Sequence, residues 1–139
     1  MYAESSGVLA WLLGEPAGPA VAEILAGAEF VVTSDLTLVE CDRILLRSHV
    51  LRRLTEARHA DLRSLLNRTV ARWSVLRLDR DIIERARRPF PGEPIRTLDA
   101  LHLATALTTR ARAGARALLS LDQRIRAAGR ELGFELLPA

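Results

Sequence analysis

The segment Arg96–Leu107 reads RTLDALHLATAL and predicts a helix that carries an acid on its buried side. Thr97 is the expected N-cap, because its hydroxyl can accept hydrogen bonds from the free backbone N–H groups of the first turn. Leucine and alanine recur through the segment and give the helix a wide apolar face. Asp99 lies in the first turn, where the positive end of the helix dipole stabilises an acid. An acid on the core side of a helix is also typical of a functional site, which would need partner residues from elsewhere in the chain.

Short apolar segments alternate with helical patterns on both sides of this segment. The expected strands cover residues 1–3, 30–33, 75–78, 117–121 and 134–137. The expected helices cover residues 7–14, 19–28, 55–73, 79–87 and 122–132, with one more beginning at the cap Ser34-Asp35. This alternation predicts an α/β fold, a three-layer sandwich with a central, mainly parallel five-stranded sheet.

Two long helices in the middle of the chain are expected to form an antiparallel hairpin. The first carries apolar side chains that we expect to face inward: Leu36, Val39, Ile44, Leu45 and Leu46. Glu40 lies one turn from both Leu36 and Ile44, so it is expected beside this buried stripe. Farther along, residues 89–94 read PFPGEP, which excludes regular structure and predicts a loop directly before the Asp99 helix.

Length and composition are those of an ordinary water-soluble domain. The chain has 139 residues, 49% of them hydrophobic and 27% charged, so we expect one domain spanning residues 1–139. No apolar run approaches the length of a membrane span, and the start of the chain lacks the pattern of a secretory signal, so the expected location is the cytoplasm. The single cysteine, Cys41, excludes an intramolecular disulfide and a zinc cage built from cysteines.

The charge is modestly basic. All 20 basic residues are arginines, and the net charge is +3. Arginine suits phosphates and carboxylates, but the base composition of a genome also explains an absence of lysine. The charge therefore allows a nucleic-acid partner without indicating one.

Four acids are expected to converge at one edge of the sheet. Glu4 and Asp122 follow the first and fourth strands, and Glu40 and Asp99 lie near the starts of helices reached from strand ends. Ligands of open α/β sheets bind at the carboxyl ends of the strands. Because carboxylates held together repel one another, such a cluster needs a cation. An all-oxygen set favours Mg²⁺ or Mn²⁺ over zinc, and such ions activate water for attack on phosphorus.

Each of these acids also has a purely structural interpretation. Asp122 can be the N-cap of the helix that it precedes, and Asp99 can simply complement a helix dipole. Glu40 can pair with an arginine one turn on, and Glu4 can be a surface charge near the chain end. His102 follows Asp99 by one turn; it can orient the acids or contact RNA, but a histidine in an apolar helix is more often a packed, hydrogen-bonded residue.

Four strings that contain these acids follow one another in a recognisable order. They are Glu4-Ser5-Ser6, Leu36-Thr37-Leu38-Val39-Glu40, Thr97-Leu98-Asp99-Ala100-Leu101-His102-Leu103-Ala104, and Leu119-Ser120-Leu121-Asp122-Gln123-Arg124 followed by Leu132-Gly133. Together they span nearly the whole chain and resemble the motifs of the PIN-domain nucleases, most closely the VapC-type toxins of bacterial toxin–antitoxin pairs.

The resemblance implies an endoribonuclease that uses Mg²⁺ or Mn²⁺. It assigns catalytic and metal-binding roles to Glu4, Glu40, Asp99 and Asp122, and it places Ser6 at a small polar position that supports the metal or its waters. It further implies an RNA substrate such as tRNA or rRNA, a homodimer, and a cognate antitoxin whose tail fills the acidic cleft.

Glu4 departs from this pattern, because the family usually has aspartate at that position. One additional methylene moves the carboxylate by roughly 1.3 Å, which is large against the octahedral geometry that magnesium requires. Either the backbone retreats to compensate or the site is weakened. The alternative to a nuclease is therefore a catalytically weakened PIN-fold module that mainly binds antitoxin or RNA. A phosphoacceptor receiver domain is disfavoured, because its chemistry requires a lysine near the acids and the chain has none. A haloacid-dehalogenase-like phosphatase is also disfavoured, because it requires two aspartates around the end of the first strand and Glu4-Ser5-Ser6 does not supply them.

Overall fold

The computed structural model describes residues 1–139 and contains one sheet of five parallel strands. The strands are β1 (Tyr2–Ala3), β2 (Val32–Ser34), β3 (Ser74–Leu76), β4 (Ala117–Leu119) and β5 (Glu135–Leu137). Their order is β3-β2-β1-β4-β5, and every neighbouring pair is parallel. The predicted α/β fold with a five-stranded sheet is confirmed, and the sheet is wholly parallel.

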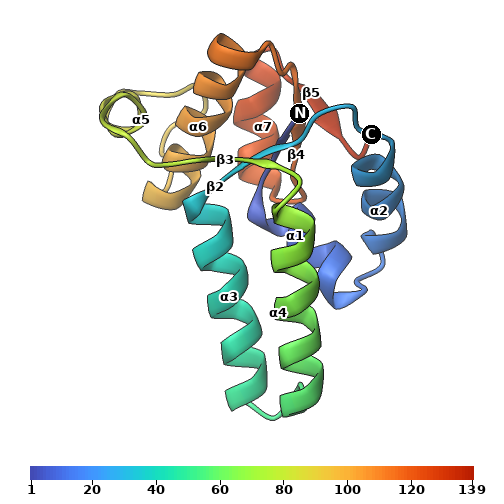
Figure 1. The fold of residues 1–139 in the computed structure, drawn as a ribbon. Coiled ribbons are helices and arrows are strands. Elements are labelled where there is room, and N and C mark those ends of the chain that lie inside the picture. Colours follow the sequence, from blue (N-terminus) through green and yellow to red (C-terminus); the bar gives the residue numbers. More distant parts are fainter.

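Helices cover both faces of the sheet and complete the three layers (Figure 1). One face packs against α1 (Ser5–Leu13), α2 (Gly18–Gly27), α3 (Asp35–Val50) and α4 (Glu56–Val70), and the other against α5 (Arg80–Ala86), α6 (Thr97–Ala113) and α7 (Gln123–Glu131). Successive strand residues point to opposite faces. Tyr2 and Leu118 therefore join the core beneath α5–α7, while Ala3 and Leu119 join the core beneath α1–α4.

Helix α1 approaches the sheet closely and then turns sharply into α2. A Cβ atom at Gly7 would lie 3.0 Å from Leu119 Cγ, so the glycine lets the start of α1 lie against β4. Gly14 ends the helix in the left-handed conformation, with φ 67°.

No single helix of the chain has the length and apolar character of a membrane span. Helices α1 and α2 reach that length and character only when they are taken together, across a bend of 113°.

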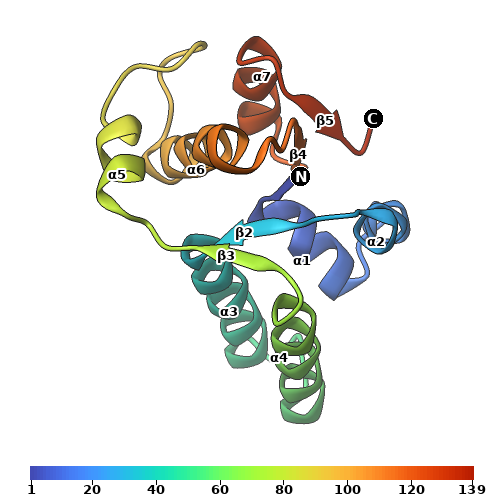
Figure 2. The ribbon, with the colours of Figure 1, turned by 45° about the horizontal axis from the view of Figure 1, so that its top comes forward.

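Helices α3 and α4 form the predicted antiparallel hairpin, which extends away from the sheet (Figures 1 and 2). Arg63 of α4 pairs with Asp42 of α3 at 2.9 Å. The prediction that Val39, Ile44 and Leu46 face inward is wrong, because these side chains are 58%, 37% and 39% exposed. The hairpin projects beyond the sheet, so only one narrow stripe of α3 has a layer to pack against.

Several predicted boundaries differ from the observed ones by a few residues, and two of these differences have a clear physical reason. Strand β2 begins at Val32, whereas the sequence predicted a start at Phe30; β1 pairs Tyr2 with Val32, so Phe30 has no strand residue opposite it. Thr97 is not the N-cap of α6 but its first helical residue. Arg96 has the extended N-cap backbone and makes no side-chain cap bond, and its carbonyl accepts from Ala100 N–H at 2.8 Å.

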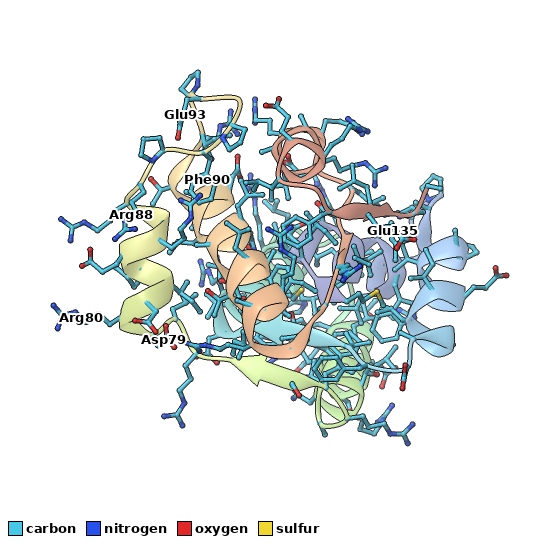
Figure 3. All side chains as sticks on the ribbon, turned by 90° about the horizontal axis from the view of Figure 1, so that it is seen from above. Asp79, Arg80, Arg88, Phe90, Glu93 and Glu135 are labelled. Carbon is cyan, nitrogen blue, oxygen red and sulfur yellow. The ribbon has the colours of Figure 1, made fainter.

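The predicted loop at residues 89–94 connects α5 to α6. The carboxylate of Glu93 organises the loop by accepting from Phe90 N–H at 3.1 Å and Ile95 N–H at 2.5 Å. Phe90 is buried beside α6, whereas Arg80 and Arg88 point away from the body of the protein (Figure 3). The loop thus covers the outer end of the core and leads into the first turn of α6, where Asp99 lies.

Candidate active site

The four acids singled out in the sequence line one pocket beyond the carboxyl ends of the strands. Glu4 directly follows β1, Glu40 lies in the second turn of α3, Asp99 lies in the first turn of α6, and Asp122 precedes α7. The pocket has a volume of about 300 Å³, and Ser6, His102 and Arg43 also line it. Four larger hollows, of about 620, 600, 530 and 390 Å³, contain none of these four acids. The acids converge because all five strands are parallel and end at the same edge.

Glu4 is the N-cap of α1, and hydrogen-bond donors surround its carboxylate. Oε1 accepts from Ser5 Oγ at 2.6 Å and from Ser6 N–H at 3.1 Å. Oε2 accepts from Ser6 Oγ and from Ser120 Oγ at 2.8 Å. A carboxylate offers about four acceptor positions, and these four donors fill them. The side chain thus absorbs its additional methylene by folding back over its own helix start, where the residue is only 3% exposed.

Ser6 links the Glu4 carboxylate to the loop that carries Asp122. Its hydroxyl donates to Glu4 and accepts from Leu121 N–H at 2.7 Å and Asp122 N–H at 3.1 Å. Since a hydroxyl has one hydrogen and two lone pairs, these three bonds use its full capacity. Ser6 therefore binds two segments of the site together.

His102 bridges Glu4 and Glu40 inside the pocket. Its Nε2 donates to Glu40 Oε2 at 2.6 Å and lies 3.7 Å from Glu4 Oε1. Burial acts to raise the pKa of Glu40, but the hydrogen bond from His102 and the electrostatic attraction to it outweigh burial and hold that pKa below its ordinary value. The sequence alternative that pairs Glu40 with a nearby arginine is wrong, because its partner comes from α6.

Asp99 and Asp122 form the other side of the pocket. The Oδ2 atom of Asp99 is buried and has no hydrogen-bond partner. Burial raises the pKa of Asp99, and the negative charge of Asp122 raises it further, against the opposing charges of Arg96, Arg124 and His102. A buried, unpaired carboxylate oxygen beside a second carboxylate is a place where a cation is strongly favoured.

Asp122 caps α7, in agreement with the structural interpretation of its sequence position. Its Oδ1 accepts from Arg124 N–H at 2.8 Å and Ile125 N–H at 3.1 Å. The cap fixes the carboxyl group at the pocket wall and leaves Oδ2 without a bond to the protein. Capping and a place in the site are therefore compatible for this residue.

These residues fit a hard divalent cation. Asp99 presents an orphaned oxygen, Asp122 presents a second one, and the Glu40 side chain is 23% exposed at the pocket. Oxygen donors of this kind suit Mg²⁺ or Mn²⁺. Glu4, Glu40 and His102 also bring one potential ligand atom each to within 4.8 Å of one another. Glu4 can contribute directly only by releasing one of its present donors.

Sequence reasoning missed Ser120 as a part of this site and left the role of His102 open between orienting the acids and packing in the core. Ser120 is fully buried and donates to Glu4, although it stands 116 residues away in the chain. The string LSLD, with a hydroxyl two residues before an acid at a strand end, was the only available signal. His102 is a packed, hydrogen-bonded residue, as its apolar helix indicated, but its partner is an acid of the site itself.

Comparison with known proteins gives three concordant results. A model of the PIN domain family matches residues 1–131. Ribonuclease VapC46 of Mycobacterium tuberculosis (strain ATCC 25618 / H37Rv) is 32% identical over 137 residues, which is 99% of this chain and 95% of that protein. The crystal structure of Mycobacterium tuberculosis VapC20, described as a sarcin-ricin loop cleaving toxin, has a similar fold with a TM-score of 0.66. That similarity covers 96% of this chain and 95% of VapC20 at 18% identity.

Proposed function

Because the chain belongs to the PIN-domain family, as a VapC-type nuclease, we propose that it is a metal-dependent endoribonuclease and the toxin of a toxin–antitoxin pair. In this proposal residues 1–139 act as a single PIN-like nuclease domain. The reaction is hydrolysis of an RNA phosphodiester bond, and Mg²⁺ is the expected ion, with Mn²⁺ as a substitute. Its substrate is a tRNA or an rRNA.

One observation carries this proposal. Four carboxylates of separate elements line a pocket of about 300 Å³, and one of them, Asp99, keeps a buried oxygen without any partner. A buried anion without a partner is costly, so a protein keeps such a group where a ligand supplies the missing charge. A divalent cation supplies that charge and, when bound, activates water and stabilises the charge that develops on phosphorus.

The acids of the pocket take different roles in this reaction. Asp99 and Asp122 supply their free oxygens to the metal, and Glu40 supplies a third carboxylate from the opposite wall. Ser6 and Glu4 hold the Asp122 loop against the start of α1. That Glu4 and Ser6 themselves contact the ion stays a prediction, because each already uses its bonding capacity inside the protein. Arg43 is exposed and lines the same pocket, where it can bind a phosphate of the RNA.

A second candidate function rests on Glu4. Four donors fill its acceptor positions, so the site has one free carboxylate fewer than its acid count indicates. If three carboxylates do not hold the ion tightly enough, the chain is a catalytically weakened module that mainly binds its antitoxin or RNA. The affinity for metal therefore separates the two functions.

We further propose a cytoplasmic homodimer that a cognate antitoxin inhibits. Large apolar side chains remain exposed on the hairpin and beside the pocket, which supports burial of these surfaces against partners: Val39, Ile44, Leu46, Val50, Leu51 and Leu98. An arginine in the antitoxin tail would find a favourable position among the acids. Light scattering of the purified chain, alone and with its antitoxin, tests both partners.

The experiment that tests the proposed function is cleavage of a pool of structured RNA by the antitoxin-free protein. Reactions with Mg²⁺, Mn²⁺ and EDTA run beside Asp99→Asn, which keeps the shape of the side chain and removes its charge. Metal-dependent cuts that the variant cannot make support the nuclease, and the cut positions identify the target. Equal cutting by wild type and Asp99→Asn would rule out this site. Absence of cutting with either metal, together with tight RNA or antitoxin binding, favours the weakened module.

A further inference from the structure

A chain of buried hydrogen bonds runs from the start of α3, through the core, to the Glu40 carboxylate. Thr37 N–H donates to Ser34 Oγ at 3.3 Å, and Ser34 Oγ lies 3.1 Å from the Tyr2 hydroxyl. The Tyr2 hydroxyl lies 2.9 Å from His102 Nδ1, and His102 Nε2 lies 2.6 Å from Glu40 Oε2. Ser34 and Tyr2 are fully buried, and His102 is 1% exposed.

With a neutral imidazole, the two ends of this chain fix the direction of every bond in it. An ionised carboxylate only accepts hydrogen bonds, so Nε2 of His102 carries the single ring hydrogen. Nδ1 then accepts from the Tyr2 hydroxyl, which in turn accepts from Ser34. The Ser34 hydroxyl accepts from the backbone of α3. With these directions no donor or acceptor in the chain is left unsatisfied, and one tautomer of the imidazole is selected.

On this basis, and resting on the proposed metal-dependent nuclease, we propose that His102 is a positioning residue for Glu40 and that Tyr2 positions His102. The Nε2–H group holds one Glu40 oxygen against α6. The Tyr2 hydroxyl, supported by Ser34, fixes the imidazole from its other side. Glu40 is thereby oriented before any ion enters.

This role differs from that of a metal ligand. A ligating imidazole nitrogen must present its lone pair to the ion, whereas Nε2 here uses its hydrogen to bind Glu40. Nδ1 faces the Tyr2 hydroxyl, and Tyr2 lies in the core and does not line the pocket. Nδ1 is therefore turned away from the place where an ion would bind. His102 therefore acts on the ion only through the carboxylate. Groups that orient a ligand in this way affect metal affinity by about 10- to 100-fold.

The test measures binding of Mn²⁺ alone to the full chain by calorimetry and by the electron paramagnetic resonance signal of free Mn²⁺. We expect His102→Leu to weaken binding by about 10- to 100-fold and Tyr2→Phe by about tenfold. His102→Gln retains an N–H donor in a similar position and is expected to recover most of the affinity. Since Tyr2 lies outside the pocket, a loss in Tyr2→Phe has to act through His102.

Thr109→Val is the matched control. Its hydroxyl is equally buried and donates to Thr105 O at 2.8 Å, on the same helix but away from the pocket. The control is expected to lose stability and keep its Mn²⁺ affinity. Tyr2→Phe with an affinity equal to that of Thr109→Val would overturn the proposal. A ¹⁴N coupling to bound Mn²⁺ that disappears in His102→Gln would also overturn it, because the imidazole would then be a ligand.

A second readout needs neither metal nor RNA, so it separates this inference from the proposed function. A ¹⁵N–¹H correlation spectrum of the metal-free chain at about pH 8, where an ordinary imidazole is neutral, shows which ring nitrogen of His102 carries the hydrogen. We expect the hydrogen on Nε2 in the wild type and a weaker preference in Tyr2→Phe. A hydrogen on Nδ1 would refute the relay even if the protein cleaves RNA. Failure of wild type to bind Mn²⁺ refutes the proposed function and leaves this readout to decide the relay.

Discussion

Glu4→Asp tests whether the serine hydroxyls around this carboxylate are fitted to the length of glutamate. Aspartate is a good N-cap, so we expect the bond from Ser6 N–H to persist. The carboxylate retracts by roughly 1.3 Å, one methylene projected along the side chain. The 2.8 Å contact with Ser120 Oγ then lengthens to about 4 Å, beyond the ~3.5 Å limit of a hydrogen bond.

The lost bond sets the size of the effect. A hydrogen bond to a charged group contributes about 1.5–3 kcal/mol, and Ser120 is fully buried and cannot replace its acceptor with water. We therefore expect Glu4→Asp to lower the free energy of unfolding by about 2 kcal/mol. For a chain of this size that corresponds to a fall in Tm of roughly 8 °C. Thermal and urea unfolding measure it, with the exposed Glu29→Asp as the matched control.

A double-mutant cycle identifies the bond responsible. Ser120→Ala is expected to cost about 2 kcal/mol in the wild type and much less in the Glu4→Asp background, where Ser120 Oγ has lost this bond and keeps its bond from Asp122 N–H at 3.2 Å. Additive losses would show that Glu4 and Ser120 do not interact, and they would refute the reasoning. So would a Glu4→Asp variant as stable as Glu29→Asp, because the pocket would then accept either length.

Three further predictions concern the titratable groups. Asp99→Asn is expected to stabilise the metal-free protein by on the order of 1 kcal/mol at neutral pH after solvent screening. The raised pKa of Asp99 means that its ionised form costs stability above that pKa, so calorimetry in EDTA should show the advantage of the variant shrinking as the pH falls. The effect of Glu40 on folding stability has the opposite sign, because its pKa is lowered in the folded protein. The stabilisation by ionised Glu40 is complete above the ordinary pKa of 4.5 and is lost as the pH falls below that value. In urea unfolding, the Glu40→Gln variant should therefore be less stable than the wild type at neutral pH, and the difference in the free energy of unfolding should shrink in acid. Burial raises the pKa of the Cys41 thiol, so a thiol reagent should modify the native chain at least about tenfold more slowly than the urea-unfolded chain.

Local rules predicted most of the fold. The alternation of short apolar segments with helical patterns gave the parallel sheet, since strands buried on both faces are continuously apolar. The N-cap roles expected for Ser34 and Asp122 are confirmed, because a short polar side chain before an apolar periodic run reports directly on backbone geometry. The same rule gave a wrong N-cap at Thr97. Arg96 is the N-cap of α6 and makes no side-chain cap bond, so no short polar residue marks the start of that helix.

Exposure on the hairpin was harder to predict. Val39 and Ile44 satisfy the period of a buried stripe, yet both are exposed, because hydrophobic periodicity does not indicate where the covering layer ends. The same side chains become candidates for contact with a partner. The pattern was therefore read correctly as an apolar face and wrongly as core.

The sequence by itself determined which residues are candidates for the chemistry: acids at strand ends and helix starts, in an order that matches the PIN domain. Only the tertiary structure decided what each acid does, because its partners are remote in the chain. Ser120 reaches Glu4 across 116 residues, Tyr2 meets His102 across 100, and His102 meets Glu40 across 62. Periodicity and capping act within a few residues, whereas contacts at these separations depend on the order in which the strands assemble. That order places one histidine between two carboxylates and leaves Asp99 unpaired, and these two features support the cation site that we propose.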